Sequence, residues 1–165
     1  MGSTRTTTEF TAFYEATKDA VFRAVLLARG GEAEGAEDAV AEAYERALLR
    51  WEKLRAHDNP TGWVIRTAIN HRISMWRRHG RRGAGTPPTA SLPIESIDPA
   101  LLRIVRELPR GQREVLALRV LLDFSVDQTA DALGIRPGTV KAQLHRALAA
   151  LRAELATRQP EEVWQ

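Results

Sequence analysis

The residues of this chain that could bind a ligand are segregated by charge. Between residues 59 and 94 there is no Asp or Glu, but there are six arginines and two histidines: Arg66, Arg72, Arg77, Arg78, Arg81, Arg82, His71 and His79. Just before this stretch, acidic residues dominate: Glu32, Glu34, Glu37, Asp38, Glu42, Glu45 and Glu52. An acidic element beside a basic one indicates two different partners. Two solvated helix faces that only keep the chain soluble would give the same pattern.

The sequence carries no arrangement typical of catalysis or of metal binding. It has no cysteine, which excludes disulfides, thiolate metal sites and cysteine nucleophiles. It has no glycine-rich phosphate loop followed by lysine. Its histidines are scattered, at His57, His71, His79 and His145. We therefore expect no enzymatic activity, no cofactor and no metal.

Composition indicates a folded protein that remains inside the cell. Hydrophobic residues make up 44% of the 165 residues and charged residues 27%, which is enough apolar material for a core. No run of about 18 apolar residues is present, so no membrane insertion is expected. The first thirty residues lack the features of a secretion signal. Together with the absence of cysteine, this favours a cytoplasmic location.

Breaker residues divide the chain into two helical units. The stretch from Gly83 to Pro93 is rich in Gly, Pro, Ser and Thr and has no periodicity, which is typical of a flexible linker. We predict an all-α protein with two small domains. The predicted boundaries are 1–82 for the first domain, 83–97 for the linker, 98–156 for the second domain and 157–165 for a tail.

Helical periodicity predicts which side chains of the first unit are buried. The expected helices are 9–28, 36–51 and 59–78. In the second of these, the stripe through Val40 and Tyr44 faces the core, so the acidic stripe faces outward. The third begins with Asn59 as N-cap and Pro60 as the first helical residue. Its isoleucines face the core.

The opposite arc of that third helix carries polar and aromatic side chains. They are Trp63, Arg66, Asn70, His71, Ser74, Arg77 and Arg78. An aromatic ring among cations can stack on a base while the cations hold phosphates. Two simpler explanations remain open. Trp63 can cap the core under the preceding loop, and the last two arginines can complement the helix dipole.

The second unit ends in a helix-turn-helix pattern. Ser125 and Gln128 form a capping-box sequence, Gly134 supplies the turn, and Pro137 begins the next helix. Val140 points into the core, and the outward arc carries Thr139, Lys141, Ala142, Gln143, His145 and Arg146. Such a helix fits the DNA major groove. Gln143 suits adenine, and Arg146 or Lys141 suits guanine or a phosphate.

The whole chain resembles a bacterial RNA polymerase sigma factor of the extracytoplasmic-function (ECF) group, within the sigma-70-like family. The resemblance is carried by residues 36–44 (AEDAVAEAY), 59–72 (NPTGWVIRTAINHR), 108–119 (LPRGQREVLALR) and 133–141 (LGIRPGTVK). Such a protein binds core RNA polymerase and directs promoter-specific transcription initiation. The resemblance implies sigma domain 2 for residues 1–82 and sigma domain 4 for residues 98–156.

The resemblance also implies roles for individual residues. Contacts with the polymerase, through its β′ and β subunits, fall on Glu37, Asp38, Glu42 and Glu45. Recognition of the promoter −10 element falls on Arg55, His57, Asp58, Asn59, Trp63, Arg66, Asn70, Arg77 and Arg78, where the loop at 54–61 captures a flipped base. Recognition of the −35 element falls on Arg136, Thr139, Lys141, Gln143, His145 and Arg146. The partners implied are core polymerase, promoter DNA and an anti-sigma factor.

The chain departs from the family pattern at several of these positions. Ala142 and Gln143 stand where the family often has Ser-Arg, so the −35 sequence read here is expected to be unusual. Arg136 replaces a cap residue and is interpreted as a phosphate contact. Ala41 stands near a usual Gln of the docking segment. The alternative function is a helix-turn-helix repressor or activator that acts without docking on polymerase.

Overall fold

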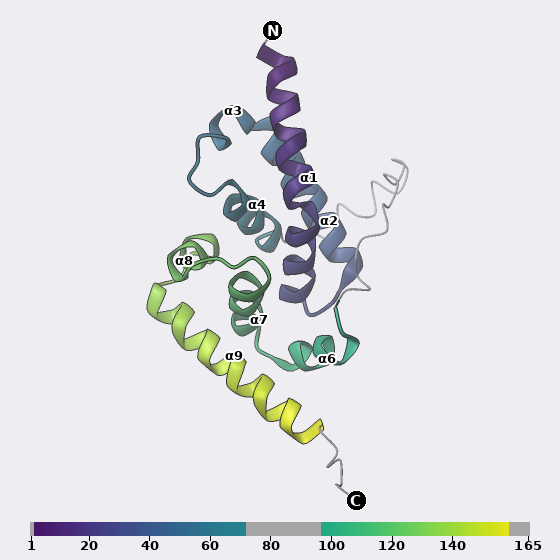
Figure 1. Cartoon of the computed structure of the whole chain (residues 1–165), viewed down its shortest axis with the longest axis vertical. Coiled ribbons are helices and arrows are strands. Elements are labelled where there is room, and N and C mark those ends of the chain that lie inside the picture. The colour runs from purple at the N-terminus through teal and green to yellow at the C-terminus, as the bar shows by residue number, and fades with distance from the viewer. Residues whose placement is uncertain (1, 72–96, 159–165) are drawn as a thin grey trace, which may run out of the picture.

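The computed structural model describes residues 2–71 and 97–158, and within them every regular element is a helix (Figure 1). The first unit contains α1 (Gly2–Ala28), α2 (Ala33–Leu49), α3 (Trp51–Leu54) and α4 (Pro60–Ile69). The second contains α6 (Pro99–Glu107), α7 (Arg110–Leu116) with the π-helical segment η2 (Ala117–Leu121), α8 (Val126–Leu133) and α9 (Pro137–Arg158). The all-α prediction is confirmed.

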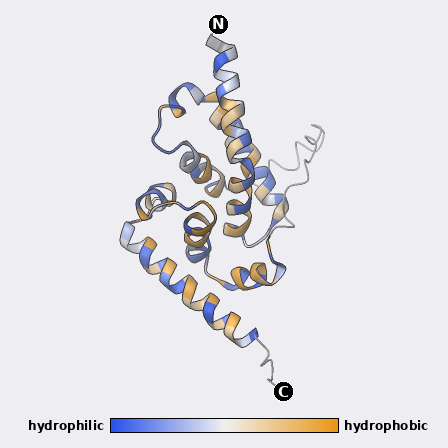
Figure 2. Ribbon diagram, in the orientation of Figure 1, coloured by the Kyte–Doolittle hydropathy of each residue, from blue (hydrophilic) through white to orange (hydrophobic). Residues whose placement is uncertain are grey.

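Helix α1 begins earlier than the expected Glu9. Its first turns are rich in threonine, and the hydroxyls of Thr6, Thr8 and Thr11 donate to backbone carbonyls four residues earlier. These turns extend past the other helices (Figure 1) and are hydrophilic to neutral, whereas the later turns carry hydrophobic residues beside hydrophilic ones (Figure 2). Only the second half of α1 therefore carries a fully buried stripe.

The end of α1 is a glycine turn. Gly30 and Gly31 have φ of 70° and 86°, and the Gly31 amide donates to the Leu26 carbonyl at 2.8 Å. A left-handed residue ends a helix, and glycine suits this position because a β-carbon would be strained there. The turn sends the chain back along α1 as α2.

Three helices share the core of the first unit. Val21, Phe22 and Leu26 of α1 are almost completely buried, and they belong to one cluster with the alanine-rich inner face of α2. Helix α2 ends at Leu49, before the predicted Trp51. Trp51 is nevertheless buried, with its ring centroid 4.9 Å from that of Phe13.

Helix α4 has the predicted start and orientation. The Asn59 side chain accepts a hydrogen bond from the Gly62 amide at 2.9 Å, and Pro60 is the first helical residue. Ile65 and Ile69 are buried while Arg66 is exposed. The predicted unbroken helix to Arg78 is wrong, because α4 ends at Ile69 with Asn70 as its C-cap and His71 is not helical. Arg77 and Arg78 themselves lie outside the described residues.

The predicted helix-turn-helix is confirmed. Ser125 and Gln128 make both bonds of a capping box, and Gly134 ends α8 with φ of 67°. Val140 and Ala130 belong to one small buried cluster between the two helices. Helix α9 follows the outer edge of the molecule (Figure 1).

The two units pack on each other. Helix α1 contacts α7 and η2, and α4 contacts α8. One buried cluster includes Val25 of the first unit and Leu118 of the second. Arg106 donates to the Gly30 carbonyl at 2.7 Å, and Arg113 donates to the Ala28 carbonyl at 3.2 Å. Among the described residues, no helix is long and apolar enough to cross a membrane.

Candidate nucleic-acid interface

The acidic side of α2 is partly exposed and partly used within the chain. Asp38 and Glu45 are exposed, whereas Glu37 and Glu42 are half-buried. Glu42 accepts a hydrogen bond from Arg46, and its other oxygen lies 3.0 Å from Nδ1 of His71, directly after α4. Glu42 therefore also joins α2 to α4, which the stripe alone does not reveal.

The loop before α4 is held by α1. Arg55 donates to Glu9 at 2.7 Å and lies 3.6 Å from Glu52. The hydrogen bond from Arg55 is the main cause that lowers the pKa of Glu9, and the same bond raises the pKa of Arg55. The predicted DNA-contacting Arg55 is thus paired with carboxylates in this structure.

The other polar residues of the loop organise its backbone. The Asn59 amide donates to Nδ1 of His57 at 3.0 Å, and the Asn59 side chain caps α4. A β-carbon at Gly62 would lie 2.6 Å from the Asn59 side-chain nitrogen, so the cap requires glycine there. His57 and Asp58 are exposed at the tip.

A surface hollow of about 470 Å³ lies between the end of α2 and the outer face of α4. It is lined by Arg46, Leu49, Arg50, Trp63, Arg66, Thr67 and Asn70. Trp63 is half-buried: it packs on the core and also lines the hollow. Both interpretations of Trp63 are therefore compatible with its position. No carboxylate lines this surface among the described residues.

The outward face of α9 carries most of the residues predicted for the −35 element. Thr139, Lys141, His145 and Arg146 are exposed, and Arg136 is exposed in the turn. Two small neighbours, Gly138 and Ala142, leave this face open at its start. Their spacing places them on the outward side of α9, which is the side predicted to face the DNA groove.

Gln143 lies elsewhere than expected, and its outward placement was wrong. Its side chain is half-buried, and its amide nitrogen would lie 3.2 Å from a β-carbon built on Gly111 of α7. The reason is angular: three residues after the buried Val140, a side chain lies only about 60° from Val140 around the helix. Its contact with a base stays a prediction.

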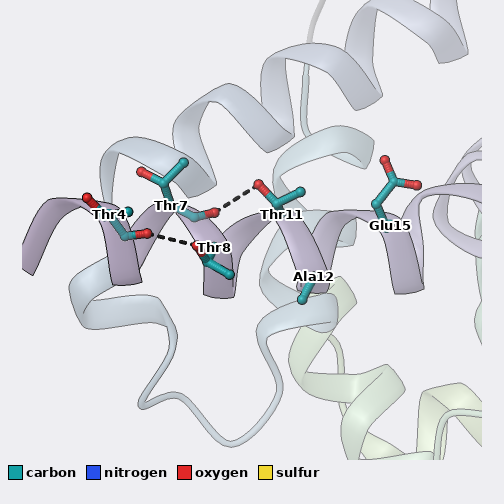
Figure 3. Close-up of a pocket in the computed structure, with 6 residues that line it drawn as sticks. All are labelled: Thr4, Thr7, Thr8, Thr11, Ala12 and Glu15. Carbon is teal, nitrogen blue, oxygen red and sulfur yellow. Dashed lines mark hydrogen bonds between the residues drawn. The ribbon is translucent and has the colours of Figure 1, made fainter.

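A second hollow follows the first turns of α1 (Figure 3). Thr4, Thr7, Thr8, Thr11, Ala12 and Glu15 line it. The hydroxyls of Thr8 and Thr11 already donate to backbone carbonyls of the same helix, as Figure 3 shows. The described residues contain no group of three acidic or histidine side chains that could hold a metal ion.

Comparisons with known proteins agree with this architecture. The family model described as Sigma-70 region 2 matches residues 13–82, and the model described as Sigma-70, region 4 matches residues 99–151. The chain is 33% identical over 159 residues to the RNA polymerase sigma-E factor of Streptomyces coelicolor, covering 91% of this chain and 88% of the relative. It is 36% identical over 132 residues to that of Streptomyces antibioticus, covering 74% and 72%.

A solved structure has a similar fold. It is the sigma factor RpoE in complex with the anti-sigma factor NepR from Bartonella quintana, with a TM-score of 0.65 and 22% identity over 90% of this chain and 99% of that one. The chain belongs to the sigma-70 family of RNA polymerase sigma factors, in its ECF group. Sigma factors direct promoter-specific transcription initiation and are not enzymes.

Sequence reasoning missed the contribution of α2 to the hollow. Arg46 and Arg50 are four residues apart, so they lie on one side of the helix, and that spacing was a usable signal. It also missed the pair of Glu9 with Arg55. Those residues are 46 positions apart, and no local pattern links them.

Proposed function

We propose that this sigma factor joins core RNA polymerase through the acidic side of α2 and reads two promoter elements with separate surfaces. Residues 1–82 form the unit for polymerase and the −10 element, and residues 98–156 form the unit for the −35 element, with 83–97 as linker and 157–165 as tail. The site of action is the cytoplasm, where polymerase and promoter DNA are.

The observation that carries this proposal is the separation of charges on α2 and α4. Asp38 and Glu45 are exposed on α2, whereas Arg66 is exposed on α4. Ile65 and Ile69 are buried, so the arginine face points to solvent. A protein partner can therefore bind the acids while a nucleic acid binds the cations.

The −10 surface combines the loop at 54–61 with the outer face of α4. Trp63 supplies an aromatic face for a base, and Arg66 supplies a cation for a phosphate. Arg77 and Arg78 are assigned to the same surface from the sequence. His57 and Asp58, at the exposed tip, are polar groups available to a flipped base.

The −35 surface is the outward face of α9. Arg146 and Lys141 are the groups suited to guanine or to phosphate, and Arg136 and Thr139 are suited to the backbone at the start of the helix. His145 is interpreted as a phosphate contact. Gln143 is the least accessible member because it lies against Gly111.

An anti-sigma factor is proposed as a further partner. The supporting fact is the fold shared with a sigma factor solved together with the anti-sigma factor NepR. The surfaces available for such a partner are the same ones assigned here to polymerase and DNA.

Transcription in vitro with purified core polymerase tests the function. Wild-type chain should direct initiation from defined start sites on genomic DNA. The double variant Asp38→Lys, Glu45→Lys should lose affinity for core polymerase in a pulldown. Asp19→Lys, Glu107→Lys changes the net charge equally on exposed positions outside α2 and should bind normally.

Two results would contradict the proposal. Tight binding of duplex DNA without any binding of core polymerase would indicate a repressor or activator instead. Equal binding of polymerase by both double variants would remove the acidic side of α2 from the interface. Glu42 is excluded from this test because it also pairs with Arg46 and His71.

A further inference from the structure

The first turns of α1 lie before the part of the chain that the region 2 family model matches. That match begins at residue 13, whereas Thr6, Glu9 and Phe10 precede it. These three side chains are half-buried, although Thr7 and Thr8 between them are exposed. One side of these turns is therefore covered by another element. That element is α3, which contacts α1 and lies beside its first turns in Figure 1.

Aromatic rings pack α3 on α1. Trp51, the first residue of α3, is 6% exposed. Its ring centroid lies 5.4 Å from that of Phe10, edge-to-face at 79°, and 4.9 Å from that of Phe13. Leu54, the last residue of α3, is buried in the same cluster as Trp51. These contacts fix the buried side of α3, whereas residues 55–58, which follow it, are exposed.

Polar contacts extend this attachment to the loop that follows α3. Arg55 donates through Nη1 to Oε2 of Glu9 at 2.7 Å, and the other oxygen of Glu9 accepts from Arg5 at 3.1 Å. The Thr6 hydroxyl contacts the Glu52 carboxylate, whose second oxygen lies 3.6 Å from Nε of Arg55. Two carboxylates therefore hold the guanidinium of Arg55 beside α1.

The exposed tip of the loop lies between two fixed ends. Arg55 is attached to α1, and the Asn59 side chain caps α4 by accepting from the Gly62 amide at 2.9 Å. Residues 56–58 between them are exposed, and Nδ1 of His57 accepts from the Asn59 amide. A loop that is ordered before it binds loses less conformational freedom on binding. The contact with α1 therefore sets the position of the tip together with the cap.

We propose that Glu9 is a positioning residue for recognition of the −10 element: through Arg55 it holds the loop at 54–61 in the form that captures a flipped base. Arg55 then acts within the chain and not on DNA. The side chains of Glu9 and Arg55 are 35% and 41% exposed, so their ion pair adds little to the stability of the fold. The inference rests on the proposed function, because the base belongs to the opening promoter.

Abasic nucleotides measure what the captured base contributes to binding. The full chain with core polymerase is bound to pre-melted promoters in which one nucleotide of the −10 non-template strand at a time lacks its base. The position where this loss weakens wild-type binding most identifies the captured base, and the ratio of the two Kd values measures its contribution. Glu9→Gln should lower that ratio about 3- to 10-fold. It should bind the abasic promoter like wild type.

Variants at Arg55 separate positioning from a contact with DNA. Arg55→Gln should lower the ratio as much as Glu9→Gln, and the double variant should lower it no further, because both changes remove one interaction. Arg55→Lys keeps a cation for Glu9 and should retain most of the ratio. Glu15→Gln, which breaks an ion pair with Lys18 on the same helix, should match wild type. Thermal unfolding of each variant verifies that the fold is retained.

Three outcomes would overturn the inference. A wild-type ratio for Glu9→Gln removes its positioning role. An equal loss by Glu9→Gln on the abasic promoter means that the change does not act through the base. A loss by Arg55→Gln that adds to that of Glu9→Gln, with the salt slope of binding reduced by about 0.7, makes Arg55 a phosphate contact. If no abasic position weakens wild-type binding, the proposed function of the loop fails first.

Discussion

Arg106 of α6 donates through Nε to the backbone carbonyl of Gly30, 2.7 Å away, across 76 positions of sequence. Arg113 of α7 makes a similar bond to the Ala28 carbonyl at 3.2 Å, and its Nη1 also binds the Leu108 carbonyl at 2.9 Å. The carbonyls of Ala28 and Gly30 lie at the C-terminal end of α1, where the helix dipole favours cations. Region 4 therefore caps a helix of region 2.

Removing this cap should loosen the contact between the two regions. The double variant Arg106→Ala, Arg113→Ala leaves carbonyls of the α1 terminus without their cationic donors, at a cost of about 1–3 kcal/mol in unfolding free energy. Small-angle X-ray scattering should show a larger radius of gyration, and denaturant unfolding should begin earlier. Arg103→Ala, exposed on the same α6, should match wild type. Identical scattering of the double variant and wild type would contradict the role of the cap.

The contact of α4 with α8 predicts that the regions separate on a promoter. Packed helices lie about 8–10 Å apart, whereas elements centred at −10 and −35 are about 25 base pairs, or roughly 85 Å, apart along the duplex. The two proposed DNA surfaces cannot reach both elements while α4 and α8 are packed. Dyes on Ala12→Cys and Arg152→Cys, in a chain without native cysteine, should lose energy transfer when polymerase and promoter are added. Unchanged transfer in an actively transcribing complex would refute the separation.

The elements with strong local signals could be predicted from the sequence. Asn59 with Pro60, and Ser125 with Gln128, are caps whose bonds depend on residues within one turn. The burial of Ile65 and Ile69 follows from their spacing on one face. Gly134 could be assigned to a left-handed position because a turn between two helices requires one.

The remaining features depend on tertiary contacts that no local pattern encodes. Helix α1 extends through a threonine run whose propensity is poor. Trp51 is buried at a helix break because Phe10 and Phe13 of α1 surround it. The contact of Gln143 with Gly111 depends on the position of α7, although the closeness of Gln143 to the buried Val140 around α9 could be read from the spacing.

The pair between Glu9 and Arg55 predicts a change at acid pH. The pKa of Glu9 lies below its ordinary value of 4.5, chiefly because Arg55 donates a hydrogen bond to the carboxylate. Because the pKa of Glu9 is lower in the folded chain than in the unfolded chain, the pair stabilises the folded chain when the pH is above the ordinary pKa. This contribution is lost as the pH falls through the lowered pKa. The loop before α4 should therefore loosen at acid pH.

Carboxyl NMR titration measures this pair directly. Arg55→Gln should raise the pKa of Glu9 toward 4.5, and Arg5→Gln should raise it less, because the Arg5 bond is the weaker cause. If Arg55→Gln leaves the Glu9 titration where it is in wild type, the pair does not exist in solution and Arg55 is available to DNA without competition.

Two glycines near the helix-turn-helix should respond to alanine in opposite directions. Gly134 has φ of 67° and Gly138 is helical, and a β-carbon at either would meet nothing within 4 Å. Gly134→Ala should therefore cost roughly 1–2 kcal/mol through backbone strain alone. Gly138→Ala should stabilise the chain by about 0.5–1 kcal/mol through helix propensity. Denaturant unfolding measures both, and a stabilising Gly134→Ala would mean that the turn is not left-handed in solution.

Arg146 separates base reading from phosphate binding on α9. Its exposed guanidinium can pair with guanine, and one good base contact is worth roughly 1–3 kcal/mol. Arg146→Ala should therefore reduce transcription from the cognate promoter and reduce it less from promoters substituted at the contacted −35 base pair. Arg152→Ala, exposed six residues later on the same helix, serves as control and should change neither. An equal loss on every −35 sequence would make Arg146 a phosphate anchor, and no loss on any of them would exclude it from the −35 surface.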